Sequence, residues 1–189
     1  MIITVLWEDS REGRTKGFGA HELRVACVAE RLGRRRYEVG KQISSSPKKG
    51  AGNVLRALKN DLHRLTKSGP VFAVIDRDKA REIWKPGPLP ADCMTAIRDR
   101  VAEHVASTGY EIVFLMQNME SLVDACEEGA VAKSARQKPS PDLRDRILGK
   151  AASESPAVAR VAVLSACPSF ARLVERVGAR LTASHAANS

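Results

Sequence analysis

Two aspartates that follow a run of apolar residues are the side chains of this sequence best suited to chemistry. The run Val71-Phe-Ala-Val-Ile75 leads directly into Asp76, Arg77 and Asp78. A continuous apolar run of this length predicts a strand that is buried on both faces. If the extended backbone continues past Ile75, Asp76 and Asp78 project on the same side of the strand. Two neighbouring carboxylates repel each other, and a divalent cation that prefers oxygen ligands, Mg²⁺ or Mn²⁺, would relieve that repulsion.

The same two aspartates have a structural interpretation of equal weight. Asp side chains at the end of a strand accept hydrogen bonds from nearby backbone N–H groups, and in this way they cap the next helix or shape a turn. The Asp-x-Asp pair alone leaves both interpretations open, so the other acidic residues of the chain have to decide between them.

Acidic residues also follow two other apolar runs. Glu8 follows residues 2–7, and Glu120 comes shortly after residues 110–116. Parallel strands end at the same edge of a sheet, so these acids could converge if the first and third strands are neighbours. The acids that would then meet are Glu8, Asp76, Asp78 and Glu120. Structural uses also stay open, because Glu120 could stabilise the start of its own helix and Glu8 could lie in solvent.

The hydrophobic pattern predicts the elements that would position these acids. We expect strands over residues 2–7, 37–43, 71–75 and 110–116, and loops over 10–18 and 44–52. Helices are expected between and after the strands, over 19–32, 53–67, 91–107 and 120–127. This alternation favours an α/β fold with a mainly parallel four-stranded sheet flanked by helices.

Three more helices, over 141–150, 156–165 and 168–181, are expected towards the C-terminus. We therefore predict an α/β domain over 1–128 and a C-terminal helical extension packed on it over 129–184. Residues 185–189 are expected to form a disordered tail.

The charge of the chain suits a phosphate-rich partner. Its 189 residues include 31 Lys and Arg against 22 Asp and Glu, a formal net charge of +9. Such an excess is typical of proteins that bind nucleic acid, although a basic surface can also serve solubility alone. Lys79, Lys133 and Lys138 could contact phosphate, and a solvated surface charge is the more common role of such lysines.

The sequence gives little support for a zinc site, a membrane-spanning segment or a signal peptide. The four cysteines and four histidines form neither a Cys-x-x-Cys pair nor a zinc pattern. No apolar run is long enough to cross a bilayer, and the N-terminus lacks the basic start and cleavage site of a signal peptide. We therefore expect a cytoplasmic protein that does not bind membranes.

The placement of the acids resembles the Toprim domain of topoisomerases, primases and overcoming-lysogenization-defect (OLD) nucleases. That domain also has a Glu after its first strand and Asp-x-Asp after a later one. The sequence is most similar to small stand-alone Toprim-like proteins of poorly characterised function, through Asn118-Met-Glu120-Ser-Leu122 and Pro168-Ser-Phe170-Ala-Arg-Leu173. One difference is Asp9, because many Toprim proteins have Gly directly after the Glu.

The resemblance implies a Rossmann-like fold and metal-dependent phosphodiester chemistry. Asp76, Asp78 and Glu120 would hold Mg²⁺ or Mn²⁺, and Glu8 would be a further ligand or a general acid/base. Such a nuclease would cleave or nick DNA or RNA, and it could be the effector of a bacterial (phage) defence system that works with an ATPase of the ABC/OLD class.

Two alternatives remain. The chain could be a non-catalytic Toprim-like subunit that binds or regulates such an ATPase. A haloacid-dehalogenase-type phosphatase with Asp76 as nucleophile fits less well, because Ala80 stands where that pattern has Thr or Val.

Overall fold

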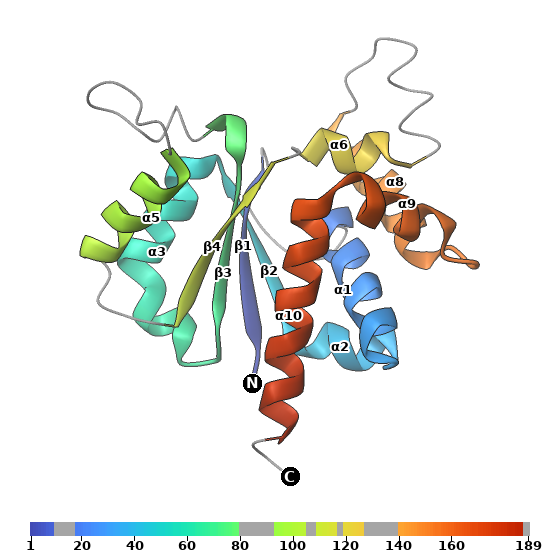
Figure 1. The fold of residues 1–189 in the computed structure, drawn as a ribbon, viewed down its shortest axis with the longest axis horizontal. Coiled ribbons are helices and arrows are strands. Elements are labelled where there is room, and N and C mark those ends of the chain that lie inside the picture. The colour runs from blue at the N-terminus through green and yellow to red at the C-terminus, as the bar shows by residue number, and fades with distance from the viewer. Residues whose placement is uncertain (10–17, 80–92, 105–108, 117–118, 127–139, 187–189) are drawn as a thin grey trace. The chain divides into compact units, whose positions relative to one another are not determined.

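The fold is that of an α/β protein (Figure 1). The computed structural model describes residues 1–9, 18–79, 93–104, 109–116, 119–126 and 140–186. No helix in these ranges is long and apolar enough to span a membrane. The strands are β1 (Ile3–Asp9), β2 (Ile43–Lys49), β3 (Val71–Asp76) and β4 (Tyr110–Leu115). The helices are α1 (Gly19–Leu32), α2 (Arg36–Gln42), α3 (Ala51–Thr66), α5 (Cys93–His104), α6 (Met119–Asp124), α8 (Pro141–Ser153), α9 (Val158–Ala166) and α10 (Pro168–Ala186).

The strands form one four-stranded sheet in the order β2-β1-β3-β4. Strand β1 pairs in parallel with β3, with Trp7 opposite Val74, and β3 pairs in parallel with β4, with Asp76 opposite Leu115. The predicted mainly parallel four-stranded sheet is therefore confirmed. The first and third strands of the sequence are neighbours, which the predicted convergence of acids requires.

Packing divides the chain into two units. The first contains residues 1–14 and 45–116, and the second contains residues 15–44 and 117–189. This grouping differs from the predicted division at residue 128, because α1 packs on α8 and α10 and so belongs with the C-terminal helices. Helix α10 continues to Ala186, beyond the predicted start of a tail at residue 185, and residues 187–189 lie outside the described part of the chain.

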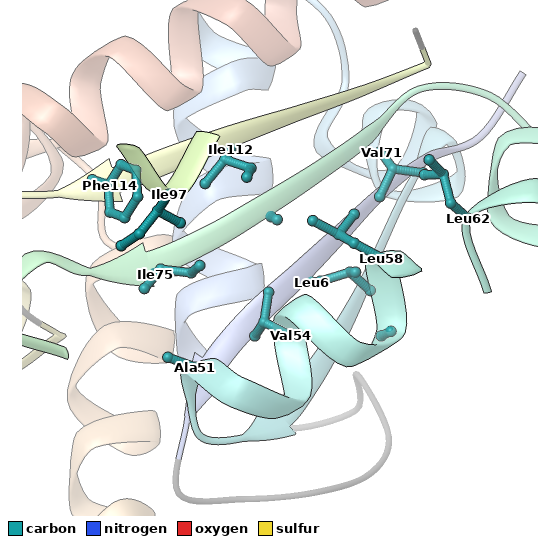
Figure 2. Packing of buried hydrophobic residues seen from close by; sticks show 12 residues of the cluster. Leu6, Ala51, Val54, Leu58, Leu62, Val71, Ile75, Ile97, Ile112 and Phe114 are labelled. Atoms are coloured by element: carbon teal, nitrogen blue, oxygen red, sulfur yellow. The ribbon is translucent and has the colours of Figure 1, made fainter. Parts of the chain in front are cut away.

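The core of the first unit lies between the sheet and helix α3 (Figure 2). Strand residues of one face, such as Leu6 and Ile75, meet buried residues of α3, such as Val54 and Leu58. Each fully buried Leu or Ile side chain stabilises the fold by roughly 1.5–3 kcal/mol. This packing holds the N-terminus of α3 against the sheet, next to the ends of β1 and β3.

The predicted strand over 37–43 is wrong. Residues 36–42 form helix α2, in which Val39 is buried and Tyr37 is 71% exposed, and the strand β2 begins only at Ile43. Strand β2 buries small or polar residues at alternate positions, so its hydrophobic pattern is weak. One of them, Ser45, accepts a hydrogen bond of 3.2 Å from the indole N–H of Trp7. A position at the edge of the sheet also allows a proline, Pro47, inside the strand.

The second unit depends on a close approach of α1 and α8. The Gly19 backbone N–H donates to Asp145 Oδ1 at 2.9 Å. The N-cap residue of α1, Phe18, forms no side-chain cap, so this acid of α8 accepts a hydrogen bond at the N-terminus of α1 instead. Nearby, Arg160 donates to the carbonyl oxygens of Ala151 and Ala152 near the end of α8 and pairs with Glu30 of α1. These contacts join the N-terminal helix α1 to the C-terminal helices.

Candidate functional site

Glu8 lies at the carboxyl end of β1 and is only 8% exposed. Its Oε2 atom accepts a hydrogen bond of 3.0 Å from the Asp76 backbone N–H. The carboxylate also receives the backbone N–H of Ala51. Glu8 therefore connects the ends of two neighbouring strands with the first residue of α3, and the alternative in which it lies in solvent is wrong.

The Glu8 side chain accepts a hydrogen bond at the N-terminus of α3. Helix α3 has no acid in its first turn, and its N-cap residue Gly50, at φ 89°, offers no side chain. The Gly50 N–H instead donates to the Asp9 carbonyl at 3.2 Å. The first N–H groups of a helix lack partners within it, so the Glu8 side chain supplies an acceptor that the helix itself does not provide. Glu8 therefore has a structural role that its place in the sequence did not reveal.

Burial changes the acidity of Glu8. Desolvation raises the pKa of its carboxyl from 4.5 to about 7, against the N–H of Asp76 and the charge of Lys79, which lower it. The negative charge of Asp78 raises this pKa, and the N–H of Ala51 lowers it. A carboxyl group with a pKa near 7 is present in both protonation states at neutral pH. Such a group can accept or donate a proton in a reaction.

Asp76 and Asp78 lie in different secondary-structure elements. Strand β3 ends at the half-buried Asp76, and residues Arg77–Lys79 form a turn of 3₁₀ helix in which Asp78 is exposed. The extended backbone therefore does not continue to Asp78, and the two aspartates do not project on one side of a strand as predicted. Asp78 nevertheless stays close enough to Glu8 for its charge to raise the pKa of that residue.

Glu120 belongs to the second unit, in the first turn of α6. Its Oε1 atom lies 3.8 Å from Nη1 of Arg144 on α8, and the Arg144 side chain is 11% exposed. This ion pair between two packed helices is a structural use of Glu120. In the first unit, Glu8 thus meets the backbone N–H of Asp76 and the charge of Asp78, whereas Glu120 lies against Arg144 in the second unit. Nothing in the sequence around Arg144 indicated this partner.

Of the three lysines predicted to contact phosphate, only Lys79 falls within the described residues. It closes the 3₁₀ turn after β3, and its charge lowers the pKa of Glu8. Lys133 and Lys138 lie outside the described residues. Lys79 is therefore the one predicted phosphate contact that can be placed beside the candidate site.

The fit of a metal ion to these acids is partial. Carboxylate oxygens such as those of Glu8, Asp76 and Asp78 are the ligands that Mg²⁺ and Mn²⁺ prefer. Within the described ranges, however, no three His, Cys, Asp or Glu side chains lie together in a way that could hold an ion. The types of ligand therefore suit a hard divalent cation, whereas the described side chains do not form a complete set.

Comparison of the chain with protein-family models, with curated proteins and with solved structures found no match in any of the three. A parallel sheet with acids at its carboxyl edge occurs in several α/β folds with unrelated activities, so the fold alone assigns no function. The Toprim resemblance consequently rests on the short motifs around Glu8, Asp76, Asp78 and Glu120.

Proposed function

We propose that this protein is a divalent-metal-dependent nuclease of Toprim type, with Asp76 and Asp78 as ligands of a Mg²⁺ or Mn²⁺ ion. The observation that carries the proposal is the hydrogen bond between Glu8 Oε2 and the Asp76 N–H, 3.0 Å long. It brings a buried acid of β1 to the start of the Asp-x-Asp segment, with the Asp78 charge within electrostatic range. Ligands of parallel α/β sheets commonly bind at this edge.

The proposed roles of the acids are those that the Toprim resemblance implies. Asp76, the last residue of the central strand β3, and Asp78, in the 3₁₀ turn after it, would supply oxygen ligands. Glu120 is the proposed third ligand. Glu8 is a further ligand or the general acid/base, for which a pKa of about 7 is suitable. A bound divalent ion would neutralise charge that develops on the phosphate and promote ionisation of the attacking water.

The proposed substrate is the phosphodiester backbone of DNA or RNA. The net charge of +9 supports a polyanionic partner. The charge of Lys79 acts on Glu8 and lowers its pKa, which supports the proposal that Lys79 attracts a phosphate to the same edge.

The test is an incubation of supercoiled plasmid DNA and of structured RNA with Mg²⁺, Mn²⁺ or EDTA. We expect nicking or cleavage by the wild type with metal, and loss of that activity in Asp76→Ala and in Glu120→Ala. Asp61→Ala is the matched control, because Asp61 is an acid of α3 that pairs with Arg64 at 3.6 Å, away from the site. Activity that survives both site substitutions would contradict the metal assignment.

The ion pair between Glu120 and Arg144 favours a second candidate function, a non-catalytic Toprim-like subunit of an ABC-type ATPase. If Glu120 serves only the packing of α6 on α8, the proposed ligand set lacks its third acid. The first step is to look for an ABC/OLD-class ATPase gene beside the gene of this protein, and the discriminating assay repeats the incubation with any such ATPase. Stable association without cleavage under any metal condition would favour the binding subunit over the nuclease.

A further inference from the structure

The outer face of α3 carries a row of exposed basic residues. Arg56, Lys59, His63 and Lys67 are all exposed, and they follow one another at spacings of three, four and four residues. Side chains at these spacings lie on the same face of a helix. Lys67 follows the last helical residue with a right-handed helical backbone, so the row continues to it. We call these four residues the α3 basic row.

The α3 basic row faces away from the protein core. The opposite face of the helix holds Val54, Leu58 and Leu62, which are buried against the sheet (Figure 2). This packing fixes the helix, so the four side chains are presented on a rigid support. At 1.5 Å per residue, the row extends over about 16 Å, enough to contact several successive backbone groups of a long polymer.

No acidic residue in the described part of the chain is paired with the α3 basic row. Among the residues described by the structure, none of the four forms an ion pair, and the single acid of α3, Asp61, pairs with Arg64 beside the row. Helix α5 of the same unit differs, because its exposed Arg98 and Arg100 alternate with Asp99 and Glu103. A surface that served solubility alone would not require such segregation of charge.

The helix dipole explains only part of the row. Basic residues near the C-terminus of a helix are stabilising, which accounts for His63 and Lys67. Arg56 lies in the N-terminal half of α3 and Lys59 near its middle, and the dipole offers a cation no benefit at either position. A partner with negative charges along its length accounts for all four positions.

We propose that the α3 basic row binds the phosphodiester backbone of a nucleic acid, independently of its sequence. The identification of the polyanion as a nucleic acid rests on the proposed function. Helix α3 begins at Ala51, whose N–H is bonded to Glu8, so the row starts near the carboxyl edge of the sheet and runs away from it. A nucleic acid bound along the row would therefore lead towards Glu8 and the Asp-x-Asp segment.

The test measures binding without catalysis, by fluorescence anisotropy in EDTA with single-stranded DNA, duplex DNA and RNA of one sequence. The variant replaces Arg56, Lys59 and Lys67 with Gln. The control replaces three exposed arginines of α10 at similar spacing with Gln, namely Arg172, Arg176 and Arg180. Circular dichroism verifies that both variants are folded.

We expect the α3 variant to bind at least one of the three nucleic acids about tenfold or more weakly than the wild type at 100 mM salt. The slope of log K against log salt should fall by about 2–3, since each phosphate contact contributes about 0.7–0.9 to it. The α10 control should bind like the wild type. Which nucleic acid loses most affinity identifies the preferred polymer.

Equal weakening by both variants would overturn the proposal, because binding would then depend on net charge alone. Wild-type affinity of the α3 variant, or binding of anionic lipid vesicles but of no nucleic acid, would overturn it as well. The outcome is separable from the proposed function, because binding is measured in EDTA, where a metal-dependent nuclease does not cleave. Salt-dependent binding through α3 without any cleavage would remove the nuclease proposal and leave this surface in place.

Discussion

Glu8 Oε2 accepts a hydrogen bond of 3.0 Å from the Asp76 N–H, and this contact joins the carboxyl ends of the two central strands, β1 and β3. The same carboxylate meets the first N–H of α3. One buried acid therefore connects the three elements that surround the candidate site, so its protonation state should affect stability as well as any chemistry.

The first prediction concerns the pH dependence of stability in Glu8→Gln. The pKa of Glu8 is raised from 4.5 to about 7 in the folded protein, so folding favours its protonated form. The contribution of Glu8 to stability is full below pH 4.5 and is lost as the pH rises through about 7. In EDTA, the wild type should lose about 2–3 kcal/mol relative to Glu8→Gln between pH 4.5 and pH 8.

Urea denaturation at several pH values provides the measurement for Glu8. Asp78→Asn is the informative companion, because removal of the Asp78 charge lowers the pKa of Glu8 and should move the transition to lower pH. A stability difference between wild type and Glu8→Gln that does not change with pH would contradict the raised pKa.

The second prediction separates the structural and chemical roles of Glu120. Both Glu120→Gln and Arg144→Gln break the ion pair between α6 and α8, and each should cost about 1 kcal/mol or more, since Arg144 is mostly buried. Only Glu120→Gln removes a proposed metal ligand. We therefore expect cleavage to be lost in Glu120→Gln and retained in Arg144→Gln, as measured on plasmid DNA with Mn²⁺. Cleavage retained in both variants would assign Glu120 to packing alone.

The third prediction tests the approach of α1 to α8. A Cβ atom added at Gly19 would lie 2.5 Å from the Asp145 carbonyl oxygen and 2.8 Å from the Asp145 Cα. Because both are backbone atoms, Gly19→Ala must displace a helix, and we expect destabilisation by about 2 kcal/mol or more. The control is Gly52→Ala, where the added Cβ meets nothing within 4 Å. Thermal denaturation compares the two, and equal midpoints would contradict the close approach.

Much of the fold could be predicted from the sequence, because the apolar runs of β1, β3 and β4 and the amphipathic helices bury hydrophobic side chains at regular spacing. The helix predicted over 19–32 is confirmed with both ends, where Gly33 at φ 60° ends α1. Strand β2 was missed because its buried positions include Ser45 and Pro47, which carry no hydrophobic signal. The hydrophobic pattern of a sequence predicts a buried strand only where the buried side chains are apolar.

The candidate site could be predicted only in part. The alternation of elements predicted a parallel sheet but left open whether the first and third strands are neighbours. In the structure β1 pairs with β3, and this places Glu8 beside the Asp76 N–H. Two contacts between residues far apart in the sequence could not be predicted from the local pattern. They are the hydrogen bond from the Ala51 N–H to Glu8 and the ion pair between Arg144 and Glu120. The short 3₁₀ turn that carries Asp78 off the strand was also not visible in the alternation of Asp76, Arg77 and Asp78.

The most direct test of the central claim is a calorimetric titration with Mn²⁺, since it requires neither substrate nor partner. We compare the wild type, the double variant Asp76→Asn/Asp78→Asn and the control Asp61→Asn, whose acid lies on α3 and pairs with Arg64. We expect saturable binding by the wild type and the control, and binding weakened about a hundredfold or more in the double variant. Binding of equal strength by all three proteins, or no binding by the wild type, would contradict a metal site at Asp76 and Asp78.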